Sequence, residues 1–260
     1  MIMSMSRIQL ISAVLSSEKA VKKILQTSPV VGMSCKGANL GQKGGSIYLI
    51  VVSTPDDGVY VFDVRRDRNI VLDGGLVRLL QSTDVLKVIH NCGPDSATLH
   101  FEFGVKLRNC FDTQVAYRVI LEQQGLPPRV TSFPNLCAVY HIQLYQPTAQ
   151  LQQLLKDDQN VWARRPITKD MLNTAAADVI PLTSCLHRQL SSELLEESME
   201  WFDVLCEENR QSYIFYNSVA KRRKQRKDLT FTKELQDSPV MKLTDTQRHF
   251  VRGSVTEGRN

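Results

Sequence analysis

Two aspartates stand where a carboxylate could carry chemistry. Asp95 lies in KVIHNCGPDSATL (residues 87–99), where a helix is predicted to follow directly on a parallel strand. Ligands of α/β proteins gather at the carboxyl ends of such strands, so Asp95 is placed to face a cleft. Asp178 lies among apolar residues in WARRPITKDMLNTAAADVIPL (162–182), where a carboxylate must be paired, hydrogen-bonded or bound to a metal ion. The alternatives are a helix cap at Asp95 and a salt bridge from Asp178 to Arg164 or Arg165.

A third stretch, VVGMSCKGANLG (30–41), has the form of a buried strand that reaches the edge of its sheet, but it contains no carboxylate. Its polar side chains are Ser34 and Lys36. A serine hydroxyl is a poor ligand for a hard cation, and a protonated lysine repels one. This strand end therefore offers a positive charge and no anionic ligand.

The elements that must position these residues form an α/β pattern. The segment 7–26 has apolar residues at helical spacing and predicts one or two amphipathic helices. Three β-rich runs separated by glycine-bearing turns follow and predict an antiparallel meander: 30–35, 44–54 and 56–64. Strands then alternate with helices, so the sheet should be antiparallel first and parallel later.

Beyond the predicted sheet, 125–134 reads as a proline-rich loop between helices, and the chain looks helical to about residue 227. Residues 228–260 are mostly polar and charged, which suggests a loosely attached tail. We therefore expect a domain over 1–200, a helical extension with a basic run over 201–227, and the tail over 228–260.

The composition is that of an ordinary globular protein. Of the 260 residues, 42% are apolar and 23% charged, and the formal net charge is +5, which permits an anionic partner without demanding one. Six scattered cysteines form no Cys-x-x-Cys pair, which argues against a zinc ribbon or a disulfide scaffold and favours reduced packing thiols. A membrane span or signal peptide is not expected, because the chain has no run of 18 apolar residues and no basic start followed by an apolar core.

The three stretches, together with NCFDTQVAYR, resemble the RNase D-like 3′–5′ exonucleases of the DEDD superfamily over roughly residues 7–200. The resemblance implies a ribonuclease H-like mixed β-sheet flanked by helices, here with extra C-terminal helices. The spelling GANLG looks most like the branch that holds Egalitarian and exonuclease 3′–5′ domain-containing protein 1. That branch is associated with RNA-binding adaptors, including one of the piRNA pathway.

In that family, four carboxylates hold two metal ions that cleave a phosphodiester bond, and a tyrosine orients the attacking water. By position, the first two carboxylates fall on Ser34 and Lys36, the others on Asp95 and Asp178, and the tyrosine on Thr174. The resemblance thus implies a degenerate site, in which we expect Lys36 to pair with Asp95 or Asp178 in the place of the metal. It implies no catalytic residues, no bound metal and no cofactor, so that the protein would not be an enzyme. One weakly bound metal on Asp95, Asp178 and Asp112 is the alternative, although Asp112 could instead orient a neighbouring loop.

Loss of hydrolysis leaves room for binding. The cations in or next to the family motifs could line a path for single-stranded RNA: Lys36, Lys87, Arg129, Arg164 and Arg165. The run KRRKQRK predicts a nucleic-acid patch or a nuclear-localisation-like signal: Lys221, Arg222, Arg223, Lys224, Arg226 and Lys227. The alternatives are ordinary surface charges and, for the run, cations that suit the end of a helix.

The aromatic residues suggest packing and assembly. Trp162 is expected in the core rather than as a stacking platform. Beyond the exonuclease-like region, an apolar helical stretch should pack back on the domain or form a subunit interface: Trp201, Phe202, Leu205, Tyr213, Phe215 and Tyr216. We expect a homodimer.

Together these features predict an inactive exonuclease-like RNA-binding adaptor in a ribonucleoprotein pathway such as piRNA biogenesis. Its partners would be single-stranded RNA and small-RNA processing proteins, for example a Tudor-domain protein. It would be located in the cytoplasm or in a ribonucleoprotein granule. The alternatives are a protein-interaction scaffold without RNA and, less favoured, an active metal-dependent exoribonuclease.

Overall fold

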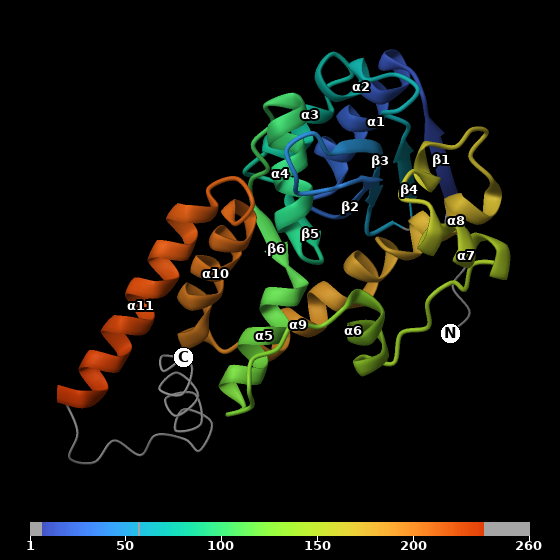
Figure 1. Ribbon diagram of the computed structural model, residues 1–260. Helices are drawn as coiled ribbons and strands as arrows, with labels where there is room; N and C mark the ends of the chain where they lie inside the picture. The colour runs from blue at the N-terminus through green and yellow to red at the C-terminus, as the bar shows by residue number, and fades with distance from the viewer. Residues whose placement is uncertain (1–6, 57, 237–260) are drawn as a thin grey trace.

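The computed structural model describes residues 7–56 and 58–236 and contains a six-stranded mixed sheet of order β1-β4-β3-β2-β5-β6 (Figure 1). Its strands are β1 (Arg7–Ile11), β2 (Val30–Ala38), β3 (Ser46–Ser53), β4 (Gly58–Phe62), β5 (Leu86–Ile89) and β6 (Cys110–Asp112). Strands β2, β3 and β4 form the predicted antiparallel meander, and β5 and β6 add in parallel. The expected α/β fold with an antiparallel start is confirmed.

The first residues of the domain differ from the prediction. Residues 7–11 form strand β1, parallel to β4, and α1 begins only at Val14 (Val14–Thr27). The apolar residues of β1 and α1 together fit the spacing of a single helix, although only α1 is helical. The free edge of β4 decides the outcome, because pairing with a neighbouring strand outweighs a local pattern of this length.

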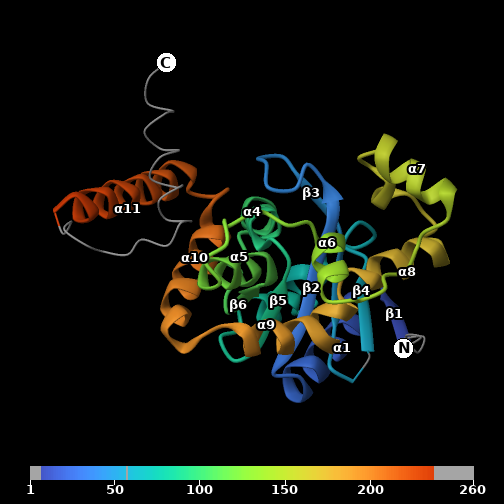
Figure 2. The same cartoon turned by 90° about the horizontal axis from the view of Figure 1, so that it is seen from below.

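Helices cover both faces of the sheet (Figures 1 and 2). Before the last strand come α1, α2 (Asn69–Leu72), α3 (Leu76–Gln81) and α4 (Cys92–Phe103). After it come α5 (Thr113–Gln123), α6 (Phe133–Val139), α7 (Ala149–Asp157), α8 (Lys169–Ala177), α9 (His187–Glu193), α10 (Met199–Gln211) and α11 (Tyr216–Gln236). Short turns of helix join them at η1 (Val161–Ala163), η2 (Leu182–Leu186) and η3 (Glu196–Ser198). The predicted loop over 125–134 is confirmed up to Ser132.

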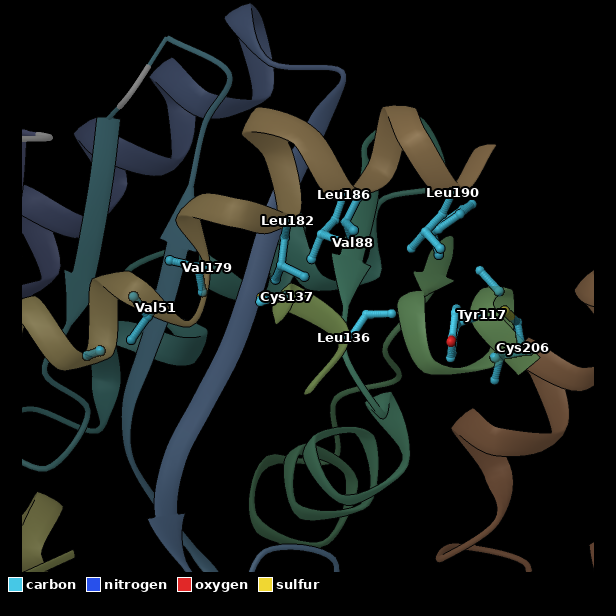
Figure 3. Packing of buried hydrophobic residues seen from close by; sticks show 14 of the residues in the cluster. Val51, Val88, Tyr117, Leu136, Cys137, Val179, Leu182, Leu186, Leu190 and Cys206 are labelled. Carbon is cyan, nitrogen blue, oxygen red and sulfur yellow. The ribbon is translucent and has the colours of Figure 1, made fainter. Parts of the chain in front are cut away.

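The sheet separates two hydrophobic cores. Strand β3 is buried on both sides: Leu49 and Val51 face one cluster, and Ile50 and Val52 face the other. Figure 3 shows part of the first cluster, where residues of η2 and α9 meet Val88 of β5 and Tyr117 of α5. Trp162 is buried in this cluster, as expected. All six cysteines are free thiols.

Of the two C-terminal helices, α10 packs on the domain and α11 packs on α10. Helix α10 packs against α4 and α5, with Phe202, Leu205 and Cys206 buried. Helix α11 lies beside α10 and continues past residue 227, where the sequence suggested that a tail begins. Residues 237–260 of that predicted tail lie outside the described residues. Within the described part of the chain, no helix has the length and apolar content needed to cross a membrane.

The first core should be sensitive to truncation at Leu190 of α9, which is fully buried. We expect Leu190→Ala to lower the free energy of unfolding by about 2–5 kcal/mol, since it removes buried apolar area and leaves a cavity. Leu15→Ala is the matched control, because Leu15 is helical but 72% exposed, and it should change stability by less than about 0.5 kcal/mol. Urea unfolding measures both, and equal losses would contradict the described packing.

Candidate functional site

The carboxyl-terminal part of β2 meets the end of α8, and this contact brings Lys36 to Asp178. The Nζ of Lys36 lies 2.5 Å from Oδ2 of Asp178 and 2.9 Å from Oγ of Ser34. It also lies 5.9 Å from the centroid of the Trp162 ring, within the range of a cation–π interaction. The Lys36 side chain is 11% exposed, so its charge is held by three neighbours and mostly shielded from water.

A β-bulge directs the Lys36 side chain toward Asp178. The register of β2 against β3 shifts between Lys36 and Gly37, and bulges of this kind redirect side chains. A Cβ on Gly37 would lie 1.9 Å from the carbonyl oxygen of Ser46, so only glycine fits beside the bulge. The glycine after Lys36 is thus a condition of the ion pair.

The pairing of Lys36 with Asp178 agrees with the expectation from sequence, and the alternative partners of Asp178 are wrong. Arg164 instead pairs with Asp158, at 2.8 Å. Arg165 reaches across to Asp63 of the turn after β4, where it makes two hydrogen bonds to the buried carboxylate.

Asp95 is turned into the protein rather than out to solvent. It is 8% exposed, and its Oδ2 accepts a hydrogen bond from the backbone N–H of Cys35, at 2.9 Å. The N-cap of α4 is Asn91, so the helix-cap alternative for Asp95 is wrong. Burial raises the pKa of Asp95 to about 6, although the Cys35 hydrogen bond and the charge of Lys36 act in the opposite direction.

Asp112 holds the loop between β5 and α4. Its carboxylate accepts hydrogen bonds from the N–H groups of Asn91 and Cys92, caps α5, and accepts a bond of 2.7 Å from Nδ2 of Asn209. It is fully buried. The expectation that Asp112 orients a neighbouring loop is confirmed, and its oxygens are already used by these donors.

Thr174 also serves its own element. Its hydroxyl donates to the carbonyl oxygen of Asp170 one turn earlier in α8, at 2.7 Å. This local bond is common for threonine within helices.

The donor set does not fit a divalent cation. Among the described residues, no three His, Cys, Asp or Glu side chains come close enough together to hold a metal ion. Near Asp178 stands an ammonium group, which is a hydrogen-bond donor and cannot ligate a cation. Mg²⁺ requires several oxygen ligands in octahedral geometry, whereas Oδ2 of Asp95 and both carboxylate oxygens of Asp112 accept hydrogen bonds from backbone N–H groups.

Comparison with known proteins gives the wider context for this geometry. The model of a 3′–5′ exonuclease domain family matches residues 11–195, which is most of the chain. The chain belongs to the 3′–5′ exonuclease family. Its relatives include an Egalitarian protein homolog of Caenorhabditis elegans, 27% identical over 73% of this chain and 34% of the relative. The piRNA biogenesis protein EXD1 of Danio rerio is 32% identical over 62% of this chain and 43% of the relative.

These relatives place the chain among the RNase D-like exonuclease-domain proteins of the EXD1 branch. The chain spans only about a third to a half of the lengths of these relatives. Solved structures confirm the fold. The catalytic core of RRP6 from Trypanosoma brucei has a TM-score of 0.63 at 19% identity, with 82% of this chain and 54% of that chain covered. Escherichia coli RNase D has a TM-score of 0.62 at 17% identity, covering 80% and 50%.

The basic residues in or next to the exonuclease-family motifs differ in their exposure to solvent. Lys87 of β5 is fully buried, and its Nζ donates to the carbonyl oxygens of Ser82 and Val85. Burial lowers its pKa to about 8. The prediction that Lys87 lines a path for RNA is therefore wrong. Arg129 is exposed, and Arg164 is about half exposed despite its ion pair.

The basic run divides between two faces of α11. Arg223 and Arg226 pair with Glu208 of α10, whose side chain is 4% exposed, and Arg226 also lies over the Trp201 ring, 5.2 Å from its centroid. Burial alone would raise the pKa of Glu208, but the hydrogen bonds and charges of these arginines hold it below its ordinary value. Lys221, Arg222 and Lys224 are exposed, with Arg222 hydrogen-bonded to Gln211.

Sequence reasoning missed the residues that fasten the site to its surroundings. The His90 ring bonds Oγ1 of Thr113 and the carbonyl oxygen of Thr131, both at 2.9 Å, and so ties the loop before α6 to α5. Burial is the main cause that lowers its pKa. The position of His90, directly before Asn91 at the junction of β5 and α4, is the sequence feature that could have identified it as a site residue. Asn209 and Glu208 had no such signal, because their partners come from distant parts of the chain.

The raised pKa of Asp95 gives a pH dependence of stability. The folded-state pKa of about 6 exceeds the ordinary 3.8, so the associated stability is present below pH 4 and is lost as the pH rises through 6. We expect the free energy of unfolding of the protein to fall relative to Asp95→Asn by about 2.5 kcal/mol between pH 4 and pH 8.

Urea unfolding of both proteins across this range measures the difference, and the isosteric variant cancels the titration of the remaining carboxylates. A difference of opposite sign would mean that Cys35 and Lys36 stabilise the ionised form more than burial opposes it.

Proposed function

We propose that this protein is a catalytically inactive exonuclease-like domain that binds single-stranded RNA as an adaptor in a ribonucleoprotein pathway, namely piRNA biogenesis. The observation that carries the proposal is the ion pair between Lys36 and Asp178. An ammonium bound to Asp178 occupies the neighbourhood where exonucleases of this type need a metal ion, and like charges repel at this range.

The other family positions support inactivity. Ser34 faces Lys36, the carboxylate of Asp95 accepts a backbone hydrogen bond, and Thr174 donates to its own helix. Two-metal hydrolysis needs the attacking and leaving oxygens clamped by both cations. We therefore propose that Ser34, Lys36, Asp95, Thr174 and Asp178 are remnants of the site and not a working centre.

RNA binding is supported by the relatives and by the surface. Several relatives are piRNA biogenesis proteins by name, and an RNase D of the same fold has been solved with the RNA U12. The exposed cations of this chain that could contact phosphates include Arg129, Arg164, Lys221 and Lys224. We also propose a homodimer, small-RNA processing proteins such as a Tudor-domain protein as partners, and a cytoplasmic location in ribonucleoprotein granules.

Restoring carboxylates should restore metal affinity. Wild-type protein should show no change in Tm with Mg²⁺ or Mn²⁺, because the ammonium of Lys36 repels the cation. A double substitution, Ser34→Asp with Lys36→Glu, should gain roughly 5–10 °C with Mn²⁺ at about 100 times Kd. Thermal unfolding with and without Mn²⁺ measures this effect.

The same samples test hydrolysis. Wild-type protein should leave a labelled RNA at full length in either metal, with Escherichia coli RNase D as the active control. RNA shortening that Asp178→Asn abolishes, or a Mn²⁺-dependent rise in the wild-type Tm, would overturn the proposed inactivity.

RNA affinity should depend steeply on salt. Contacts to about four phosphates would lower the affinity roughly 50-fold between about 50 and 200 mM salt, through release of counterions. Fluorescence anisotropy of a labelled single-stranded RNA measures the slope. Lys221→Gln with Lys224→Gln should make it shallower, whereas Lys19→Gln, a change of an exposed lysine on α1, should not. Absence of binding at low salt would leave a protein-interaction scaffold as the better explanation.

A further inference from the structure

Three aromatic side chains are exposed at the turn between α10 and α11. Tyr213 is 48% exposed, Phe215 53% and Tyr216 72%. The sequence analysis predicted that these rings pack on the domain or form a subunit interface together with Phe202 and Leu205. Phe202 and Leu205 are buried, whereas the three rings are exposed. Rings that gather on a surface mark a site of interaction more often than isolated exposed residues do.

Neighbouring residues pack against two of these rings, those of Tyr213 and Phe215. Gly41, in the loop after β2, and Gly93, in the first turn of α4, pack closely against opposite edges of the Tyr213 ring. A Cβ added at either glycine would lie only 3.0 Å from the ring. Phe215 is tilted against the ring of His100, with 6.4 Å between centroids. A platform ordered before binding loses little entropy when a ligand arrives.

The rings border two hollows. The first has a volume of about 340 Å³ and is lined by Gly41, Lys43, Phe101, Tyr213, Ile214, Phe215, Tyr216, Asn217 and Ser218. The second, of about 560 Å³, lies along α4 and α10 and shares Ile214 and Phe215 with the first. Phe215 therefore stands at the junction of the two, and the lining of the first contains a lysine and no carboxylate.

Exposed cations continue from the first hollow along α11. Asn217, Lys221 and Lys224 share one face of the helix at spacings of four and three residues, opposite buried Val219. Arg223 and Arg226 lie on the Val219 side, where Glu208 binds them. Lys43, Lys221 and Lys224 are exposed and pair with no carboxylate among the residues whose side chains are described. Helix α11 extends beyond the body of the domain (Figures 1 and 2), and Asn217, Lys221 and Lys224 are exposed among the described residues.

We propose that bases of single-stranded RNA stack on Tyr213, Phe215 and Tyr216 while Lys43, Lys221 and Lys224 neutralise the adjacent phosphates. Aromatic rings beside unpaired cations are the features with which proteins hold single strands without reading their sequence. RNA fits better than an apolar peptide, because Ile214 is the one aliphatic side chain in the lining of the first hollow. The inference rests on the proposed RNA binding and assigns it to residues other than those of the exonuclease centre, none of which line the first hollow.

The test compares two ligands of equal length and charge, a labelled oligouridylate and an abasic ribose-phosphate chain. Tyr216→Ala with Phe215→Ala should lower the affinity for oligouridylate roughly 5- to 100-fold and leave the affinity for the abasic chain unchanged, since only the first can stack. Tyr216→Phe keeps the ring and should bind like wild type. Lys221→Gln with Lys224→Gln should weaken both ligands alike.

The outcomes are distinct. If the double variant has a lowered urea midpoint, Tyr216→Ala alone replaces it in the test, because Tyr216 is the most exposed of the three rings. If wild type binds RNA and the aromatic variants bind it equally well, this proposal is overturned and the surface is left for a protein partner. If wild type binds neither ligand, the proposed RNA binding itself fails.

Discussion

The ion pair between Lys36 and Asp178 is the interaction on which the arrangement of the site depends. It joins the end of β2 to the end of α8, two elements far apart in sequence, and it fixes which charges meet at the edge of the sheet. Because the Asp178 side chain is 38% exposed, solvent screens the pair and its contribution to stability is modest. Its consequence is chemical: a cation that is part of the chain stands against the carboxylate that a divalent ion would need.

The remaining polar groups of the site are committed to the fold. Asp95 anchors β2 to α4 through Cys35, and Asp112 joins the β5–α4 loop, α5 and α10. A carboxylate surrounded by backbone donors is well suited to hold elements together and poorly suited to exchange ligands during a reaction. This division supports the proposal that the exonuclease scaffold has been kept for binding, with surfaces outside the former centre available to contact RNA.

Local patterns in the sequence predicted the parts of the fold that depend on local patterns. The β-rich runs of β2, β3 and β4, and the junctions of β5 with α4 and β6 with α5, were all recognisable. The positions of the exonuclease motifs, together with the charge of Lys36, also predicted that Lys36 would pair with an aspartate. Strand β1 was missed because its partner, β4, lies about 50 residues away and supplies the pairing that its own sequence does not signal.

Basic residues were the least predictable, because a sequence does not show which cations are already neutralised. Lys87 donates to backbone carbonyl groups of the turn between α3 and β5, Arg165 reaches Asp63, and Glu208 binds two arginines of the basic run. Each partner lies on another element or in an adjoining turn. The number of charges open to a polyanion is therefore smaller than the sequence suggests.

The pairing of Lys36 with Asp178 also bears on how such a chain can evolve. If glutamate replaced Lys36 alone, two carboxylates would face each other beside Ser34, with too few oxygen ligands to attract a metal and a repulsion in place of the attraction. Replacing Ser34 first would set another carboxylate beside an ammonium already engaged with Asp178. Each of these single substitutions loses a favourable interaction before a complete set of metal ligands is present. Under the proposed inactivity, the ion pair therefore opposes a stepwise return to a metal site.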